Sequence, residues 1–254
     1  MLAGTVVVVV AALVLALVVG GRADSASRAR GPAVAPGPVV LVPGYGGGTD
    51  SLDVLAARLR KDGHRALVLH LVGDGTGDLM VQARLLRSTV DGLLAGGATS
   101  VDVVGYSAGG VVARLWADEL GGGAHARRIV LLGAPNHGTD VAALAAGFGS
   151  GLCPAACEQL VPDSPLLHAL NEAGAASGPG WVSIWTDQDQ VVTPPESARL
   201  DGADNLTVQS VCTDEQVDHG SLPTDRVVQA LVVRALGPSP FVAPTAVDCA
   251  ALRG

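Results

Sequence analysis

The fold of this chain is decided by the stretch Val101-Asp102-Val103-Val104-Gly105-Tyr106-Ser107-Ala108-Gly109. Its valine-rich start predicts a strand over residues 101–104, because β-branched residues in a short apolar run favour a buried strand. After the second glycine, apolar residues recur at helical spacing to about residue 120, which predicts a helix. The two glycines permit a turn too tight for neighbouring side chains, so we expect a strand, a sharp bend carrying Ser107, and a helix.

The same alternation of short apolar runs and helical patterns continues in both directions along the chain. Near-continuous Val/Leu/Ile runs are typical of strands buried on both faces of a parallel sheet. The last helix is expected between Asp225, a favoured N-cap residue, and Gly237. The βαβ order predicts an α/β domain with a doubly wound, mostly parallel sheet. The further strands are expected at residues 38–42, 65–71, 129–132, 182–185 and 206–211.

Residues 133–180 interrupt this alternation, because they lack a convincing strand and are rich in Gly, Ala and Pro. An irregular excursion of this length inside a compact domain usually serves a function. We therefore expect a partial cap or lid beside the site that Ser107 marks.

The first 37 residues differ in composition from the rest of the chain. Residues 2–19 carry no charged side chain, and three arginines and a Pro/Gly-rich linker follow. An apolar run near this length is typical of a signal peptide or of a membrane anchor. We expect residues 1–37 to direct export, with cleavage favoured over anchoring, and residues 38–254 to form one domain. The protein is thus expected to be secreted, or held outside the cytoplasm by this segment.

Charge and cysteine content narrow the partners and cofactors. With 24 acidic and 16 basic side chains and no Lys/Arg cluster, a nucleic acid partner is not expected. Four cysteines in an exported chain favour disulfides. Of the three pairings, Cys153–Cys157 with Cys212–Cys249 is favoured, because it closes a short loop and pins the C-terminal tail. Neither cysteine segment has a His or further Cys at ligand spacing, so no metal site is expected. The sequence does not indicate an oligomeric state.

Ser107 is the candidate nucleophile, and a serine hydroxyl needs a general base that is itself oriented by a carboxylate. In sheets with a serine at such a bend, the chain order is Ser, acid, His, with the base in a loop after the last strand. Among six histidines, His219 fits this order best. His137 also follows a strand and is the rival, but it precedes every good candidate for the acid.

The acid is expected just beyond the strand at residues 182–185, where two aspartates, Asp187 and Asp189, qualify. Asp189 is favoured because it precedes a return to apolar residues at Val191 and Val192, and Asp187 stays open as the alternative. Asp218 is set aside, since an immediate neighbour of His219 rarely turns its carboxylate to the far side of the imidazole ring.

An oxyanion site needs two preorganised donors. We expect one to be the backbone amide of Ala108, which follows the nucleophile, and the other to be the amide of Tyr45 in the glycine-rich loop 43–48. This loop also invites comparison with a dinucleotide-binding fingerprint, but Thr49 stands where that pattern needs a third glycine. No organic cofactor is therefore expected.

Four segments resemble those of bacterial secreted lipases and esterases of the small triacylglycerol-lipase type, in the α/β-hydrolase superfamily. The resemblance covers about residues 38–236. It implies an α/β-hydrolase fold with Ser107 as nucleophile, Asp189 as acid, His219 as base, and Tyr45 and Ala108 as oxyanion donors. It also implies that Asn136, His137 and Gly138 support structure near the site. The segments are Pro43-Gly44-Tyr45-Gly46-Gly47, Gly105-Tyr106-Ser107-Ala108-Gly109-Gly110, Gly133-Ala134-Pro135-Asn136-His137-Gly138-Thr139 and Asp218-His219-Gly220.

These residues together predict a carboxylic ester hydrolase that acts on a lipid or other ester through an acyl-enzyme. Tyr45, Phe148 and Leu152 are candidates for the lining of an acyl pocket. Two alternatives stay open. The same triad could transfer the acyl group to an alcohol or lipid, or the fold could serve as a non-catalytic binding protein.

Overall fold

The structure, a computed structural model, describes residues 36–149 and 151–254, which form one sheet of six parallel strands in the order β2-β1-β3-β4-β5-β6. The predicted export segment lies outside these residues. Every neighbouring pair of strands is parallel, so all strands end at the same edge. The strands are β1 (Val39–Val42), β2 (Ala66–Val68), β3 (Val101–Tyr106), β4 (Ala126–Leu132), β5 (Gly180–Trp185) and β6 (Asp204–Thr207).

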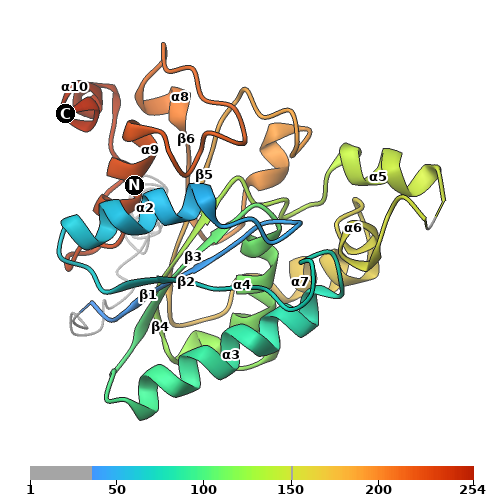
Figure 1. Cartoon of the computed structure of the whole chain (residues 1–254). Coiled ribbons are helices and arrows are strands. Elements are labelled where there is room, and N and C mark those ends of the chain that lie inside the picture. Colours follow the sequence, from blue (N-terminus) through green and yellow to red (C-terminus); the bar gives the residue numbers. More distant parts are fainter. Residues whose placement is uncertain (1–35, 150) are drawn as a thin grey trace, which may run out of the picture. The chain divides into compact units, whose positions relative to one another are not determined.

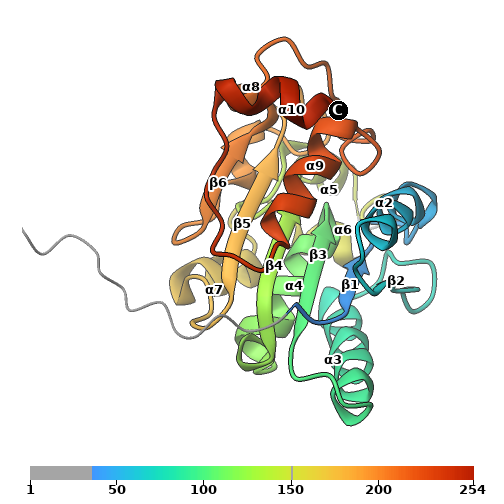
Figure 2. The same cartoon turned by 90° about the vertical axis from the view of Figure 1, so that its left-hand side faces the viewer.

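Helices cover both faces of the sheet, as Figures 1 and 2 show. One face packs against α2 (Asp50–Lys61) and α9 (Arg226–Ala235), and the other packs against α3 (Leu79–Ala95) and α4 (Ala108–Glu119). Along β1, successive side chains are buried alternately in the two apolar clusters, as the period of a strand requires. The predicted doubly wound α/β fold is confirmed.

Side-chain caps fix where several helices begin. The carboxylate of Asp225 accepts a hydrogen bond from the Val228 amide at the start of α9, as its position in the sequence predicted. The hydroxyls of Thr139 and Ser164 cap α5 (Asp140–Gly147) and α7 (Pro165–Ala173) in the same way. These caps therefore define the first residues of α5, α7 and α9.

The predicted strand at residues 206–211 is wrong in its second half. The strand β6 ends at Thr207, whose hydroxyl accepts a hydrogen bond from the Ser210 amide and opens the short helix α8 (Val208–Val211). Leu206, Val208 and Val211 are all buried, and a short apolar run of this kind does not by itself distinguish a strand from a helix. The predicted strand at residues 65–71 is likewise shortened to β2.

The excursion at residues 133–180 lacks a strand before β5, as expected, but it is more regular than its composition suggested. It holds α5, α6 (Ala155–Gln159) and α7, which lie together at one side of the domain in Figure 1. The helix α4 anchors this region, because the buried guanidinium of Arg114 donates to the carbonyl oxygen of Leu170 at 2.9 Å and to Asn171 Oδ1 at 3.0 Å.

Two disulfides, Cys153–Cys157 and Cys212–Cys249, confirm the favoured pairing. The first lies in the excursion, and the second ties α10 (Cys249–Arg253) to the end of α8. Near it, Arg253 forms ion pairs with Asp214 and Glu215. In residues 36–149 and 151–254, no helix has both the length and the apolar character needed to cross a membrane.

Replacing Cys212 and Cys249 together with serine is expected to lower the free energy of unfolding by about 3–4 kcal/mol, because the crosslink restricts a long loop in the unfolded chain. The loop spans 37 residues. Urea denaturation measures the loss. The matched control is the double serine variant at Cys153 and Cys157, whose separation is only 4 residues and whose expected loss is smaller, about 2 kcal/mol. Equal losses would contradict the loop-entropy explanation.

Candidate active site

Ser107 stands at the bend between β3 and α4 in a conformation that non-glycine residues rarely adopt, with φ 53° and ψ −128°. Such a conformation costs about 1–3 kcal/mol and persists only where the surrounding fold enforces it. The amide of Ser107 donates to the carbonyl oxygen of Leu132 at the end of β4, which fixes the bend against the neighbouring strand. The hydroxyl is thereby presented at the carboxyl edge of the sheet.

Close packing explains the glycines on both sides of this bend. A Cβ on Gly105 would lie 2.6 Å from Gly110 Cα, and a Cβ on Gly109 would overlap the carbonyl oxygens of Val42 and Pro43. Because these contacts are with backbone, the neighbours cannot move aside. The motif is therefore a steric requirement of the way α4 crosses the end of β1.

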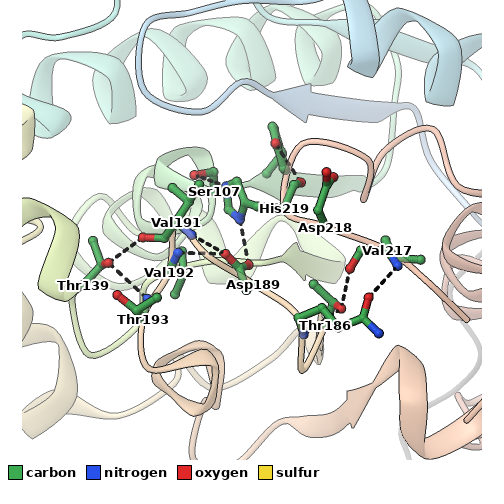
Figure 3. A network of polar contacts seen from close by, with 12 residues as sticks. Ser107, Thr139, Thr186, Asp189, Val191, Val192, Thr193, Val217, Asp218 and His219 are labelled. Atoms are coloured by element: carbon green, nitrogen blue, oxygen red, sulfur yellow. Dashed lines mark hydrogen bonds and ion pairs between the residues drawn. The ribbon is translucent and has the colours of Figure 1, made fainter.

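His219 lies against Ser107, as the close-up in Figure 3 shows. Its Nε2 atom is 3.0 Å from Ser107 Oγ, and its Nδ1 atom is 2.7 Å from Asp189 Oδ2. His219 is only 6% exposed. The two ring nitrogens thus link a hydroxyl on one side to a carboxylate on the other.

Asp189 follows β5 and is 5% exposed. Its second oxygen, Oδ1, accepts hydrogen bonds from the amides of Val191 at 2.9 Å and Val192 at 2.8 Å, as seen in Figure 3. One carboxylate oxygen is therefore held by the backbone of its own loop, which leaves the other aimed at His219.

The rival residues lie elsewhere. Asp187 is exposed, and its carboxylate accepts a hydrogen bond from the Thr207 hydroxyl. The Asp218 carboxylate accepts one from the Ser221 amide, 2.8 Å away. His137 is exposed, and its Nδ1 atom lies 3.3 Å from the carbonyl oxygen of Ser197. None of the three contacts the hydroxyl of Ser107.

Two supporting residues were not identified from the sequence. The Tyr106 hydroxyl donates to the carbonyl oxygen of His219 at 3.0 Å, and the two rings are 5.3 Å apart. Burial is the largest of the causes that raise the pKa of Tyr106 to about 12, and the negative charges of Asp189 and Asp218 add to it. The phenol therefore stays a donor across the neutral pH range. The Thr186 hydroxyl donates to the carbonyl oxygen of Val217 at 2.7 Å and joins the loop of Asp189 to the loop of His219.

The segment 134–139, which precedes α5, supports the surroundings of the site through buried contacts. Asn136 is fully buried, and its amide donates to the carbonyl oxygen of Ala198 at 2.7 Å, while its own carbonyl oxygen accepts from Arg114 and Asn171. A Cβ on Gly138 would lie 2.6 Å from Pro162 Cα. These contacts fit the supporting role that the family resemblance implied for Asn136 and Gly138.

The glycine-rich loop after β1 lies directly over Ser107. A Cβ on Gly44 would be 2.9 Å from Ser107 Cβ, so only glycine allows this approach. The following amide, that of Tyr45, and the amide of Ala108 at the start of α4 have no hydrogen-bond acceptor among residues 36–149 and 151–254. Both predicted oxyanion donors are thus unengaged beside the serine.

An apolar cavity of about 220 Å³ opens beside Ser107. Tyr45 and Leu152 line it as predicted, whereas Phe148 does not; it is 71% exposed nearby, beyond the end of α5. The other walls come from α5, α6 and the Asp189 loop. Their lining residues include Val141, Ala142, Ala145, Cys157, Val191 and Val192.

No three His, Cys, Asp or Glu side chains among the described residues are grouped so that they could hold a metal ion.

The parallel sheet, the serine at the strand-to-helix bend and the imidazole beside it define the α/β-hydrolase class of fold.

Solved structures share this fold. Aspergillus fumigatus lipase B matches with a TM-score of 0.69 and 18% identity, over 86% of this chain and 56% of its own. A Bacillus licheniformis lipase in its mature form matches with a TM-score of 0.61 and 17% identity, over 78% of this chain and 90% of its own. The chain therefore spans just over half of the fungal lipase and most of the mature bacterial one. No curated protein sequence matches the chain.

The family model described as lipase (class 2) matches residues 80–229. This match spans more than half of the sequence and includes Ser107, Asp189 and His219. The chain belongs to the class 2 lipase family, which confirms the resemblance inferred from its motifs.

Replacing Tyr106 with phenylalanine is expected to lower the free energy of unfolding by about 1 kcal/mol, because the His219 carbonyl loses its donor. The matched control is Tyr45→Phe, which removes the hydroxyl of a tyrosine that is 45% exposed and should leave the free energy within about 0.5 kcal/mol. Urea titration of both variants measures the difference. Indistinguishable stabilities of Tyr106→Phe and wild type would show that the hydrogen bond to the His219 carbonyl oxygen contributes nothing to the free energy of unfolding.

Proposed function

We propose that this protein hydrolyses carboxylic esters, with Ser107, His219 and Asp189 as a catalytic triad. The observation that carries the proposal is the continuous path Ser107 Oγ to His219 Nε2 at 3.0 Å and His219 Nδ1 to Asp189 Oδ2 at 2.7 Å, beside an apolar cavity. Membership of the class 2 lipase family supports it. A serine, an imidazole and a carboxylate linked in this order form the arrangement that activates a hydroxyl at neutral pH.

The reaction follows from which atoms face each other. The imidazole keeps a proton on Nδ1, which donates a hydrogen bond to Asp189. Its Nε2 atom accepts the Ser107 proton as Oγ attacks the ester carbonyl. The negative charge on the carbonyl oxygen is stabilised by the amides of Ala108 and Tyr45, assisted by the N-terminus of α4. His219 then protonates the leaving alcohol. In the second half, His219 deprotonates a water that attacks the acyl-enzyme, and Ser107 is released.

The cavity beside Ser107 supports an ester with an apolar acyl chain as substrate. Its walls include Val141, Ala145 and Leu152, so an acyl chain entering from solvent buries apolar surface, worth about 0.8 kcal/mol per methylene. A charged acid part would lose its hydration there without gaining a partner. We infer that lipid or other apolar esters are the substrates.

The two disulfides support maturation in an oxidising compartment. We propose accordingly that residues 1–37 direct export, either as a signal peptide that is cleaved off or as a membrane anchor. Residues 38–254 form the exported domain.

Replacing Ser107 with alanine is expected to reduce the turnover of a p-nitrophenyl ester by about 10⁴-fold or more, because no other hydroxyl of the described residues forms a hydrogen bond with the His219 ring. The rate is followed by release of p-nitrophenolate from purified protein. A fluorophosphonate should label wild type at Ser107 and leave the alanine variant unlabelled. Unchanged turnover in the variant would eliminate the serine mechanism, and a wild type that neither turns over esters nor reacts with the phosphonate would favour a binding protein. Product partitioning toward added alcohols, in preference to water, would favour an acyltransferase.

The identity of the acid is tested by comparing Asp189→Asn with Asp187→Asn, two identical changes in one loop. We expect Asp189→Asn to lower kcat by about 10³- to 10⁴-fold, since the amide no longer accepts the Nδ1 proton and holds the wrong tautomer. Asp187→Asn should stay within about threefold of wild type, because its carboxylate contacts Thr207 and is exposed. A larger loss in the Asp187 variant would reverse the assignment.

A further inference from the structure

We propose that Thr139 is a positioning residue that holds Asp189 through the peptide group between Val191 and Val192, and so links the helix that lines the acyl cavity to the acid of the triad. The inference rests on the proposed ester hydrolysis. It concerns a hydroxyl that contacts neither Ser107 nor His219.

The contacts of the Thr139 hydroxyl carry the inference. Its Oγ1 donates to the carbonyl oxygen of Val191 at 2.5 Å and accepts from the amides of Thr193 at 3.1 Å and Val141 at 3.3 Å. Figure 3 shows the hydroxyl between both parts of the loop that follows Asp189. Thr139 therefore clamps that loop while it caps α5.

The same peptide continues the path to the acid. The Val191 amide donates to Asp189 Oδ1, and the neighbouring Val192 amide donates to the same oxygen. The peptide group between Val191 and Val192 thus contacts Thr139 through its carbonyl oxygen and Asp189 through its N–H. Without the Thr139 donor, this peptide group keeps its hydrogen bond to Asp189 but loses the one that holds its carbonyl oxygen. The direction of Asp189 Oδ2 toward His219 then becomes less well defined.

Thr139 is itself held rigidly. Its side chain is buried, its amide donates to the carbonyl oxygen of Leu160 at 3.0 Å, and the amide of Asp140 donates to the carbonyl oxygen of Thr193 at 2.9 Å. Ser197 donates to the carbonyl of Gly138, which fixes the preceding residue. A rigid anchor on the excursion is what a loop carrying a catalytic group requires, because errors of about 1 Å in placement cost about 100-fold in rate.

Thr139→Val tests the hydroxyl, since valine keeps the shape of the side chain and the lining of the cavity. We expect kcat for a p-nitrophenyl ester to fall about 10- to 100-fold with KM within about twofold. Thr139→Ser, which restores the hydroxyl, should recover kcat to within about threefold. The matched control is Ser164→Ala. The Ser164 hydroxyl is also buried, caps α7 and donates to a backbone carbonyl, that of Gln159 at 2.7 Å, but it does not touch the acid loop, so its loss should leave kcat unchanged.

A double-mutant cycle with Asp189→Asn separates positioning from a general structural effect. If Thr139 acts through Asp189, then Thr139→Val should cause no further loss of kcat in the Asp189→Asn background. An equal loss in both backgrounds would overturn the proposal, as would a serine variant as impaired as the valine variant or a valine variant with wild-type kcat. Should Thr139→Val fail to fold, Thr139→Ala removes the same hydroxyl without placing a methyl group at its position.

The rate of fluorophosphonate labelling at Ser107 is measured on every variant, because it reports activation of the serine without requiring ester turnover. A wild type that is labelled but hydrolyses no ester would refute the hydrolase function and still allow the Thr139 comparison. A wild type that hydrolyses esters, with labelling rates that do not change on Thr139→Val, would refute the positioning role alone.

Discussion

The bend between β3 and α4 is the constraint on which the rest of the structure depends. Ser107 keeps a left-handed φ of 53° because the elements around it leave no alternative, and an isolated peptide of the same sequence would relax. Gly105 and Gly109 let α4 approach the strand ends closely enough to enforce this conformation. The hydroxyl is thus held in place by the folding of the whole domain, before any ligand arrives.

Convergence at one edge of the sheet supplies the other groups. Because β1, β3, β5 and β6 are parallel, the loops that follow them meet at their carboxyl ends. The imidazole of His219 is oriented by a carboxylate on its ring and by the Tyr106 phenol on its backbone. Both contacts come from residues that follow or end a strand, so the geometry of the sheet sets the geometry of the polar groups.

The sequence predicts the parts of this site that carry local signals. Ser107 lies in a motif of consecutive residues whose steric meaning is readable, and chain order singles out His219. Asp187 and Asp189 lie in one loop after β5 and differ in the burial and direction of their side chains, which depend on tertiary contacts. The contact of Thr139 with Val191 joins residues 52 positions apart and has no local signal. The end of β6 is missed for a related reason, since the buried Val208 belongs to an apolar run that is compatible with a strand or with a helix.

In the loop of Asp189, the main chain and the side chains have different tasks. The main chain of Val191 and Val192 holds the carboxylate, while their side chains face the cavity. Main-chain contacts are indifferent to side-chain identity. Natural variation or laboratory evolution can therefore reshape this wall of the cavity without disturbing the contact between Asp189 and His219, which makes these two positions the natural starting points for diversification.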